Sequence, residues 1–183
     1  GYAPECEVAT AFNTYINGGP DELLSLEETT VLIEAEVDPF ESLSCAYTDP
    51  CDVISAYTNW SFYSDLGSSD IVEMLEGGAT VSEIMSCSND DISHCNMVNA
   101  YASTDDDDIL DESEILELLN AGVDLYYINY CGYAPECEVA TAFNTYINGE
   151  LTTENSTIIE GAGISLDVFN DCNTIDECGV PNG

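Results

Sequence analysis

The chain of 183 residues contains no lysine and no arginine, against 37 aspartate and glutamate residues. An average domain carries charges of both signs on about a quarter of its residues, so this absence is a selected property. Nucleic acids and anionic membrane surfaces need a positive face on the protein that binds them, and both are therefore excluded as partners. The formal net charge of −37 makes the folded chain repel itself. Divalent cations as counterions, high salt or a medium of about pH 4 would relieve that repulsion.

The chain also lacks the residue patterns of zinc sites, membrane spans and catalytic centres. The chain has no Cys-x-x-Cys pair and a single histidine, His94, so a structural zinc site is excluded. It has no run of about 18 apolar residues, so no segment is predicted to span a membrane. His94 precedes Cys95, but adjacent side chains at a helix start rarely face each other, and this cysteine is expected to be oxidised. Because no nucleophile, base and cation converge, the sequence predicts that the protein is not an enzyme.

The residues that are present indicate a folded protein in an oxidising compartment. Hydrophobic residues make up 45% of the chain and eleven residues are tyrosine, unlike the composition of a disordered acidic tail. Nine cysteines indicate disulfides rather than a reduced cytosol. The predicted location is extracellular or at the cell surface. The chain begins at Gly1 without a methionine or a signal peptide, which indicates a processed product or part of a longer protein.

The sequence is repetitive. Residues Gly1–Gly18 recur without change at Gly132–Gly149. Similar openings start at four cysteines, and each leads through apolar stretches to a closing cysteine: Cys6, Cys51, Cys95 and Cys137 open the modules, and Cys45, Cys87, Cys131 and Cys172 close them. The predicted modules are residues 1–45, 46–87, 88–131 and 132–172, about 43 residues each, and residues 173–183 begin a further module or form a tail. Such a period is typical of stacked repeat proteins.

Each module opening carries an apolar stripe of helical period. The stripe consists of Val8, Ala11, Phe12 and Tyr15, of Val53, Ala56, Tyr57 and Trp60, and of Val139, Ala142, Phe143 and Tyr146. A polar loop, a second helix and a short third apolar piece follow. Glycines at 77, 78, 122 and 161 are expected to end the second helix in three modules, and Pro39 in the first. The predicted fold is all-α, with tandem disulfide-stapled helical repeats stacked as a short solenoid-like array.

Two disulfide pairings fit the number of cysteines and their positions in the modules, and the sequence does not choose between them. In the first, each module is stapled end to end: Cys6 to Cys45, Cys51 to Cys87, Cys95 to Cys131 and Cys137 to Cys172, which leaves Cys178. In the second, each linker is closed into a small ring: Cys45 to Cys51, Cys87 to Cys95, Cys131 to Cys137 and Cys172 to Cys178, which leaves Cys6. Loop-closure estimates of roughly 4 kcal/mol for the long rings and roughly 2.4 kcal/mol for the short ones favour the first pairing weakly. Either way one cysteine remains for a bond to another module or subunit.

An acidic segment of the third module, residues 103–114, places oxygen-bearing side chains at loop positions 1, 3, 5, 9 and 12. These candidate metal ligands are Ser103, Asp105, Asp107, Asp111 and Glu114. The segment resembles an EF-hand or dockerin-type loop, and the resemblance implies a bound calcium ion. It departs from that pattern in having serine at the first position and Asp108 in place of glycine at the sixth. The alternative is a solvated acidic loop whose side chains cap a helix.

Two functions from different classes fit these features. The first is a structural protein that self-assembles, head to tail, into a filament, fibre or cell-surface layer, or decorates one. The second is a secreted calcium-binding module that docks to a partner. A secreted chain would also offer two N-glycosylation acceptors, Asn59 and Asn155. Neither end of the array carries an evident cap, so a stacking surface is expected to be exposed at both ends.

Overall fold

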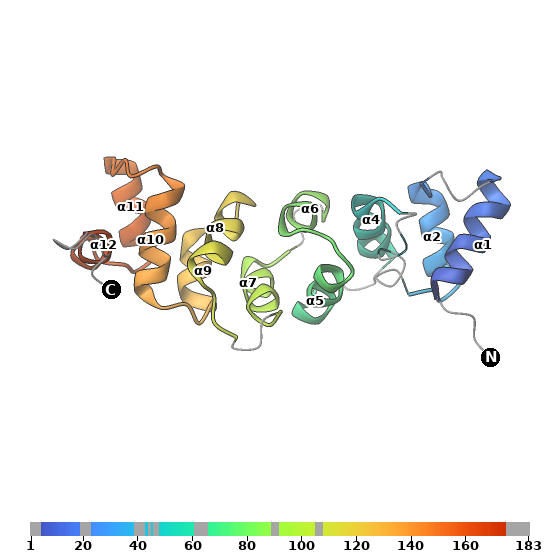
Figure 1. Cartoon of the computed structure of the whole chain (residues 1–183), viewed down its shortest axis with the longest axis horizontal. Helices are drawn as coiled ribbons and strands as arrows, with labels where there is room; N and C mark the ends of the chain where they lie inside the picture. The colour runs from blue at the N-terminus through green and yellow to red at the C-terminus, as the bar shows by residue number, and fades with distance from the viewer. Residues whose placement is uncertain are drawn as a thin grey trace. The chain divides into compact units, whose positions relative to one another are not determined.

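The computed structural model describes residues 5–18, 23–38, 43, 45, 48–60, 66–88, 92–104 and 108–174. Within these ranges the chain forms eleven helices and no β-strand, apart from an isolated parallel bridge between Leu24 and Thr48 (Figure 1). The prediction of an all-α protein is confirmed. The chain divides into two compact units, Gly1–Ser93 and His94–Gly183, and each is described by itself.

The first unit contains the first two modules. Its helices are α1 (Glu5–Asn17), α2 (Leu26–Glu34), α4 (Pro50–Trp60), α5 (Ser68–Glu76) and α6 (Val81–Cys87). Helix α2 packs closely on α4, and α4 packs on α6. One cluster of the core consists of Ala9, Leu24, Leu32 and Val37, with Val8 and Phe12 partly buried against it. Ile54, Ile71, Met74 and Ile84 are fully buried further along the chain.

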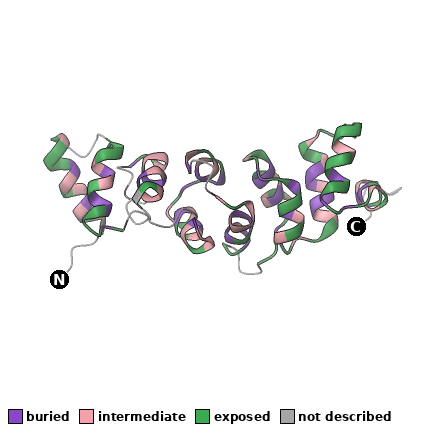
Figure 2. Cartoon of the chain, turned by 180° about the vertical axis from the view of Figure 1, so that it is seen from behind, coloured by how far each residue is buried: buried purple, intermediate pink, exposed green. Residues whose placement is uncertain are grey.

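The second unit contains the third and fourth modules, in the same order of helices. These are α7 (His94–Ala102), α8 (Glu112–Asn120) and α9 (Leu125–Cys131), then α10 (Glu136–Tyr146), α11 (Thr153–Gly161) and α12 (Leu166–Asn173). Helix α7 packs on α9 and α10 packs on α12, which are contacts within one module. Helix α8 packs on α10, and α9 packs on α11, which join the two modules. Figure 2 shows that the buried residues lie on the packed faces of these helices.

The third apolar piece of each module was expected to be short. In three modules it is a complete helix, α6, α9 or α12. Thr80 and Ser165 begin α6 and α12 by accepting backbone N–H bonds, and Asp124 begins α9 in the same way. Each of these helices is closed or nearly closed by the module's last cysteine. The helix pattern was missed because seven or eight residues hold barely two periods.

Acidic side chains begin many of the helices. Ser25 and Glu28, Thr80 and Glu83, and Asp111 and Glu114 form reciprocal capping boxes at the starts of α2, α6 and α8. The backbone N–H of Ser25 lowers the pKa of Glu28 below its usual range. Negative charge is favoured at a helix N-terminus, so part of the acidic composition supports the helices directly. None of the helices has a basic residue in its last turn, within the part of the chain that the structure describes.

The ends of the second helices differ in part from prediction. Gly78 and Gly122 have the positive φ angles, 102° and 89°, expected of residues that end a helix. In the fourth module this role falls to Gly163, with φ of 88°, whereas Gly161 is the last residue of α11. In the first module α2 ends at Glu34, and Glu36 takes the left-handed conformation with φ of 60°. Pro39, the expected stop, lies outside the described residues.

The cysteines adopt the end-to-end pairing of the two that the sequence allows. Cys6 is bonded to Cys45, Cys51 to Cys87, Cys95 to Cys131 and Cys137 to Cys172, with Cα–Cα distances of 5.5, 5.2, 5.4 and 5.3 Å. Each bond joins the start of one module to its own end. Cys178 lies outside the described residues. Four disulfides within one chain indicate an oxidising compartment. No helix of the described ranges has the length and apolar character needed to cross a bilayer.

Candidate functional site

The predicted calcium ligands are brought together only in part. Asp105 and Asp107 lie outside the described residues. Asp111 is the N-cap of α8, where its Oδ1 accepts the Glu114 backbone N–H at 2.9 Å, and Glu114 Oε2 accepts the Asp111 N–H at 2.8 Å. The Ser103 hydroxyl donates to the Asn99 carbonyl at 2.7 Å. Three of the five candidate ligands therefore make helix-terminal hydrogen bonds, as the capping alternative requires.

One feature of this loop does match the family that it resembles. Asp108, which replaces the glycine at the sixth position, has a φ of 55°, the left-handed conformation that the turn requires. Aspartate tolerates this conformation better than most residues. Among the described residues, no three histidine, cysteine, aspartate or glutamate side chains lie together in an arrangement that would hold a metal ion.

The other residues weighed from the sequence have the following surroundings. The Nδ1 of His94 accepts the Asp124 backbone N–H at 3.2 Å, and the His94 and Tyr127 rings form a T-shaped pair with centroids 5.2 Å apart. Cys95 beside it is in a disulfide and carries no thiol. Of the two glycosylation acceptors, Asn59 is exposed, whereas Asn155 is half-buried and its amide donates to the Glu150 carbonyl at 2.6 Å.

Tyrosine hydroxyls take the place of the missing cations beside two groups of carboxylates. Tyr57 on α4 donates to Asp70 on α5 at 3.1 Å, and Tyr101 on α7 donates to Glu117 on α8 at 2.6 Å. Burial raises the pKa of Tyr57 to about 12, and the negative charge of Asp70 acts in the same direction. Burial also raises the pKa of Glu73, and its acidic neighbours contribute further. A neutral donor stabilises a carboxylate without a counter-charge, which is the only internal means open to this chain.

The Tyr57 pKa gives a test in alkali. The near-ultraviolet absorbance of the wild type and of Tyr57→Phe is titrated with alkali, and the second curve is subtracted from the first. The difference should show the ionisation of one phenol at about pH 12. The folded pKa lies above the ordinary value of about 10, so the stabilising contribution of the neutral phenol is complete below pH 10 and is lost as the pH rises to 12. The free energy of unfolding should fall over that window by less in Tyr57→Phe than in the wild type. A difference spectrum centred at about pH 10 would contradict this account.

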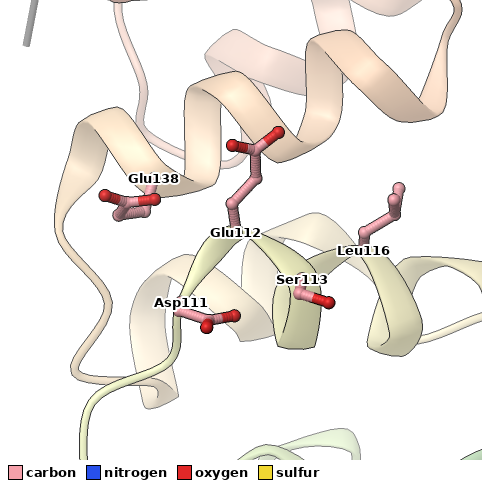
Figure 3. A pocket seen from close by; sticks show the side chains of 5 residues that line it. All are labelled: Asp111, Glu112, Ser113, Leu116 and Glu138. Atoms are coloured by element: carbon pink, nitrogen blue, oxygen red, sulfur yellow. The ribbon is translucent and has the colours of Figure 1, made fainter.

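In the second unit, the third and fourth modules meet mainly where α8 packs on α10. On α10, Val139 and Ala142 are fully buried and Phe143 is 3% exposed. Thr145 on α10 donates to Glu112 Oε1 on α8 at 3.2 Å. Figure 3 shows Glu112 pointing from α8 toward α10 at an open hollow of about 460 Å³, lined by Asp111, Glu112, Ser113, Leu116 and Glu138. The lining is mostly acidic, and its residues lie on or next to the two helices that pack together at this junction.

Two further contacts fix the register of this junction. Asn129 on α9 donates from Nδ2 to the carbonyl of Ala162, the C-cap of α11, at 2.9 Å. This amide meets a helix C-terminus where many proteins would use a lysine or arginine. Gly132, which leads from α9 to α10, is buried against the third module, and a Cβ there would lie 2.7 Å from the Ile128 carbonyl and 2.9 Å from Leu110 Cδ1. A side chain at this position would therefore separate the elements that meet there.

The duplicated segment has two different environments. Helices α1 and α10 have the same sequence over α10's whole length, yet Ala142 is fully buried whereas its duplicate Ala11 is exposed. Phe143 and Val139 are buried, while Phe12 and Val8 are only partly so. Tyr146 is 44% exposed and its duplicate Tyr15 is 85% exposed. Since the sequences are identical, the difference comes from the neighbours of each helix, and α10 has α8 as its neighbour.

The sequence predicted Ala142 as part of an apolar stripe, but it did not assign this alanine to a junction between modules, and it did not single out Asn129. The signal for the alanine was present, because every module opening carries alanine five residues after its cysteine, at Ala11, Ala56, Ala100 and Ala142. The last three are at most 1% exposed. The signal for the amide was weaker. Asparagine stands two residues before the closing cysteine in the last two modules only, at Asn129 and Asn170.

Comparison of the chain with protein-family models, with curated proteins and with solved structures found no match. The chain's own residues therefore carry what can be inferred about its function.

Proposed function

We propose that this chain is an extracellular structural repeat protein that self-assembles into a filament, fibre or cell-surface layer, or decorates one. Its modules would continue in one order as a short solenoid-like array, and the end modules would stack on other copies. The observation that carries the proposal is the use of one sequence at two places, Gly1–Gly18 and Gly132–Gly149, with Ala142 fully buried in the second copy and its duplicate Ala11 exposed in the first.

Packing between modules supports the proposal. The second helix of one module lies on the first helix of the next in both units, as α2 on α4 and as α8 on α10. The alanine at the centre of the first helix is buried in both cases, with Ala56 1% exposed and Ala142 fully buried. A small residue there lets two helices approach closely. A module that uses one face for the preceding module and another for the next has no built-in limit to its stacking.

The charge of the chain sets the conditions for assembly. Copies with a net charge of −37 repel one another, so at neutral pH and low salt the stacking of apolar faces is opposed. Near pH 4, about the ordinary pKa of aspartate and glutamate, roughly half of that charge is gone. Calcium or magnesium ions would lower the repulsion at neutral pH as counterions, and about 1 M salt would screen it beyond roughly 3 Å.

The proposal is tested by sedimentation velocity and negative-stain microscopy of the disulfide-intact chain. We expect monomers at neutral pH in low salt, and assemblies that grow in length as the pH falls toward about 4 or as magnesium or sodium chloride is added. Matched effects of the three treatments would identify charge repulsion as the opposing force. A chain that stays monomeric under all three would contradict a self-assembling function.

A calcium-binding module that docks to a partner is the second candidate. The left-handed Asp108 at the sixth position of the acidic loop favours it. In that case calcium would bind Ser103, Asp105, Asp107, Asp111 and Glu114, and the Asp111–Glu114 capping box would have to open or share its oxygens. Calcium would then raise the helix content and the melting temperature at concentrations where magnesium does not, and chelation would reverse both changes.

A further inference from the structure

Both halves of one more junction are exposed in this chain. The pairs α2–α4 and α8–α10 each join the second helix of a module to the first helix of the next. In the second unit, the pair α9–α11 also joins the third helix of the third module to the second helix of the fourth. On the first module the matching residues of α1 are exposed, and on the fourth module the matching residues of α11 and α12 are exposed. These halves can be compared with the inner junctions position by position.

The uncovered half on α1 is a stripe of Glu7, Ala11 and Thr14, which are all exposed. These residues lie at i, i+4 and i+7 on one helix face. Their duplicates on α10 form the seam with α8: Glu138 lines the hollow, Ala142 is fully buried, and Thr145 donates to Glu112. Because the sequence is the same, the α1 face already has the shape and polarity that a second helix of this type binds.

The uncovered half on the last module lies on α11. This helix and α8 are both nine residues long and end at an alanine C-cap, so Thr152 corresponds to the N-cap Asp111 and the helices align without a gap. The residues of α11 at the positions of Glu112, Leu116 and Leu119 are Thr153, Thr157 and Glu160, and all three are exposed. Threonine at such a seam has a precedent in this chain, since α2, which packs on α4, carries the half-buried Thr30 at the position of Thr157.

The third helices give the same correspondence. Asn129 on α9 donates to the C-cap carbonyl of α11 in the next module. Asn170 occupies the same position on α12, two residues before the closing cysteine, and it is exposed. The C-cap of α2 in the first module is Ala35, which is also exposed. The fourth module therefore carries a donor like Asn129, and the first module carries a C-cap carbonyl like that of Ala162.

We propose that these surfaces bind each other between two copies of the chain. The tail face, defined as Thr153, Thr157, Glu160 and Asn170, docks on the head face, defined as Glu7, Ala11, Thr14 and the Ala35 carbonyl, in the register of the junction between α8 and α10. This inference rests on the proposed self-assembly and specifies its contact. The contact is heterologous, so it leaves one head and one tail available on every oligomer.

One residue makes this end-to-end contact weaker than the inner junctions. Glu160 stands where α8 has Leu119 and α2 has Ile33, which are 4% and 3% exposed. Docking removes water from the Glu160 carboxylate, and no lysine or arginine exists in the chain to pair with it. The contact is accordingly reversible, whereas the junctions within a chain are permanent parts of its fold.

The test uses one variant that blocks the head and one that blocks the tail. Ala11→Glu and Thr157→Glu both place a carboxylate in the seam at positions that are exposed in the single chain, so the fold of each variant is kept. Ser69→Glu adds the same charge at an exposed site on α5, a helix that contributes to neither face, and serves as the control. Each blocking variant alone should associate about a hundredfold more weakly than the control, in acid or high salt.

Mixing the two variants tests whether the tail face of one copy binds the head face of another. Ala11→Glu keeps an intact tail and Thr157→Glu keeps an intact head, so an equimolar mixture should form a one-to-one dimer and nothing larger. Glu160→Leu should strengthen association about tenfold at neutral pH, and Asn170→Ala should weaken it about fivefold. If the wild type assembles but the mixture remains monomeric, or either variant assembles alone, the proposed contact is wrong and self-assembly stands. A wild type that never assembles would overturn both.

Discussion

Ala142→Glu should unfold the second unit at neutral pH, while the same substitution in the duplicate helix, Ala11→Glu, should leave stability nearly unchanged. Ala142 is fully buried in α10, beside Val139 and Phe143, and no cation in the chain can pair with a carboxylate placed there. An unpaired buried charge costs about 4 kcal/mol or more, which is a large share of the stability of a unit of this size. Ala11 is exposed, and exposed substitutions rarely change stability by more than about 0.5 kcal/mol.

The pair is a controlled comparison because the flanking residues of both sites are identical. Helix propensity, charge added and local sequence are the same, so only the tertiary environment differs. Urea unfolding followed by circular dichroism, with separate transitions resolved for the two units, would measure both changes in the free energy of unfolding. Equal effects of the two substitutions would show that α1 and α10 have the same environment, against the burial described for them.

Loss of the disulfides should be the second large effect. Each bond closes a loop of 35 to 39 residues. The chain-entropy model assigns about 4 kcal/mol to a loop of that length. A module of about 43 residues buries too little apolar surface to fold alone, so the bonds supply a stabilisation that its core cannot. The double substitution Cys137→Ser and Cys172→Ser should lower the melting temperature of the second unit by about 20 °C, and full reduction should abolish cooperative unfolding.

Thermal melts with and without reductant would measure this effect, and chelation provides the contrasting treatment. A disulfide-stapled structural array should keep its helicity in a chelator and lose it in reductant. A calcium-dependent module should respond to the chelator while its disulfides are intact. Removal of all four bonds with no change in the melting temperature would show that helix packing alone holds the modules together.

The local features of the chain could be predicted because they depend on residues close in sequence. The period of Val8, Phe12 and their counterparts predicts helices in which one face is buried. The spacing from Asp111 to Glu114 serves a capping box as well as a metal loop, since both uses require an acidic residue three positions after an N-cap. The sequence therefore does not distinguish metal binding from helix capping at this loop. The described part of the loop shows the capping contacts.

By itself, the sequence determined an acidic, all-helical chain with cysteines at the borders of its modules, because composition, period and spacing are properties that no fold is needed to read. Only the tertiary structure decided which cysteines pair, since both pairings use the same residues and differ in which Cα atoms approach to between 5.2 and 5.5 Å. It also decided that Ala142 is covered and Ala11 is not. Identical residues form identical helices because helix formation is local, whereas burial depends on what other parts of the chain, or another copy of it, bring against each face.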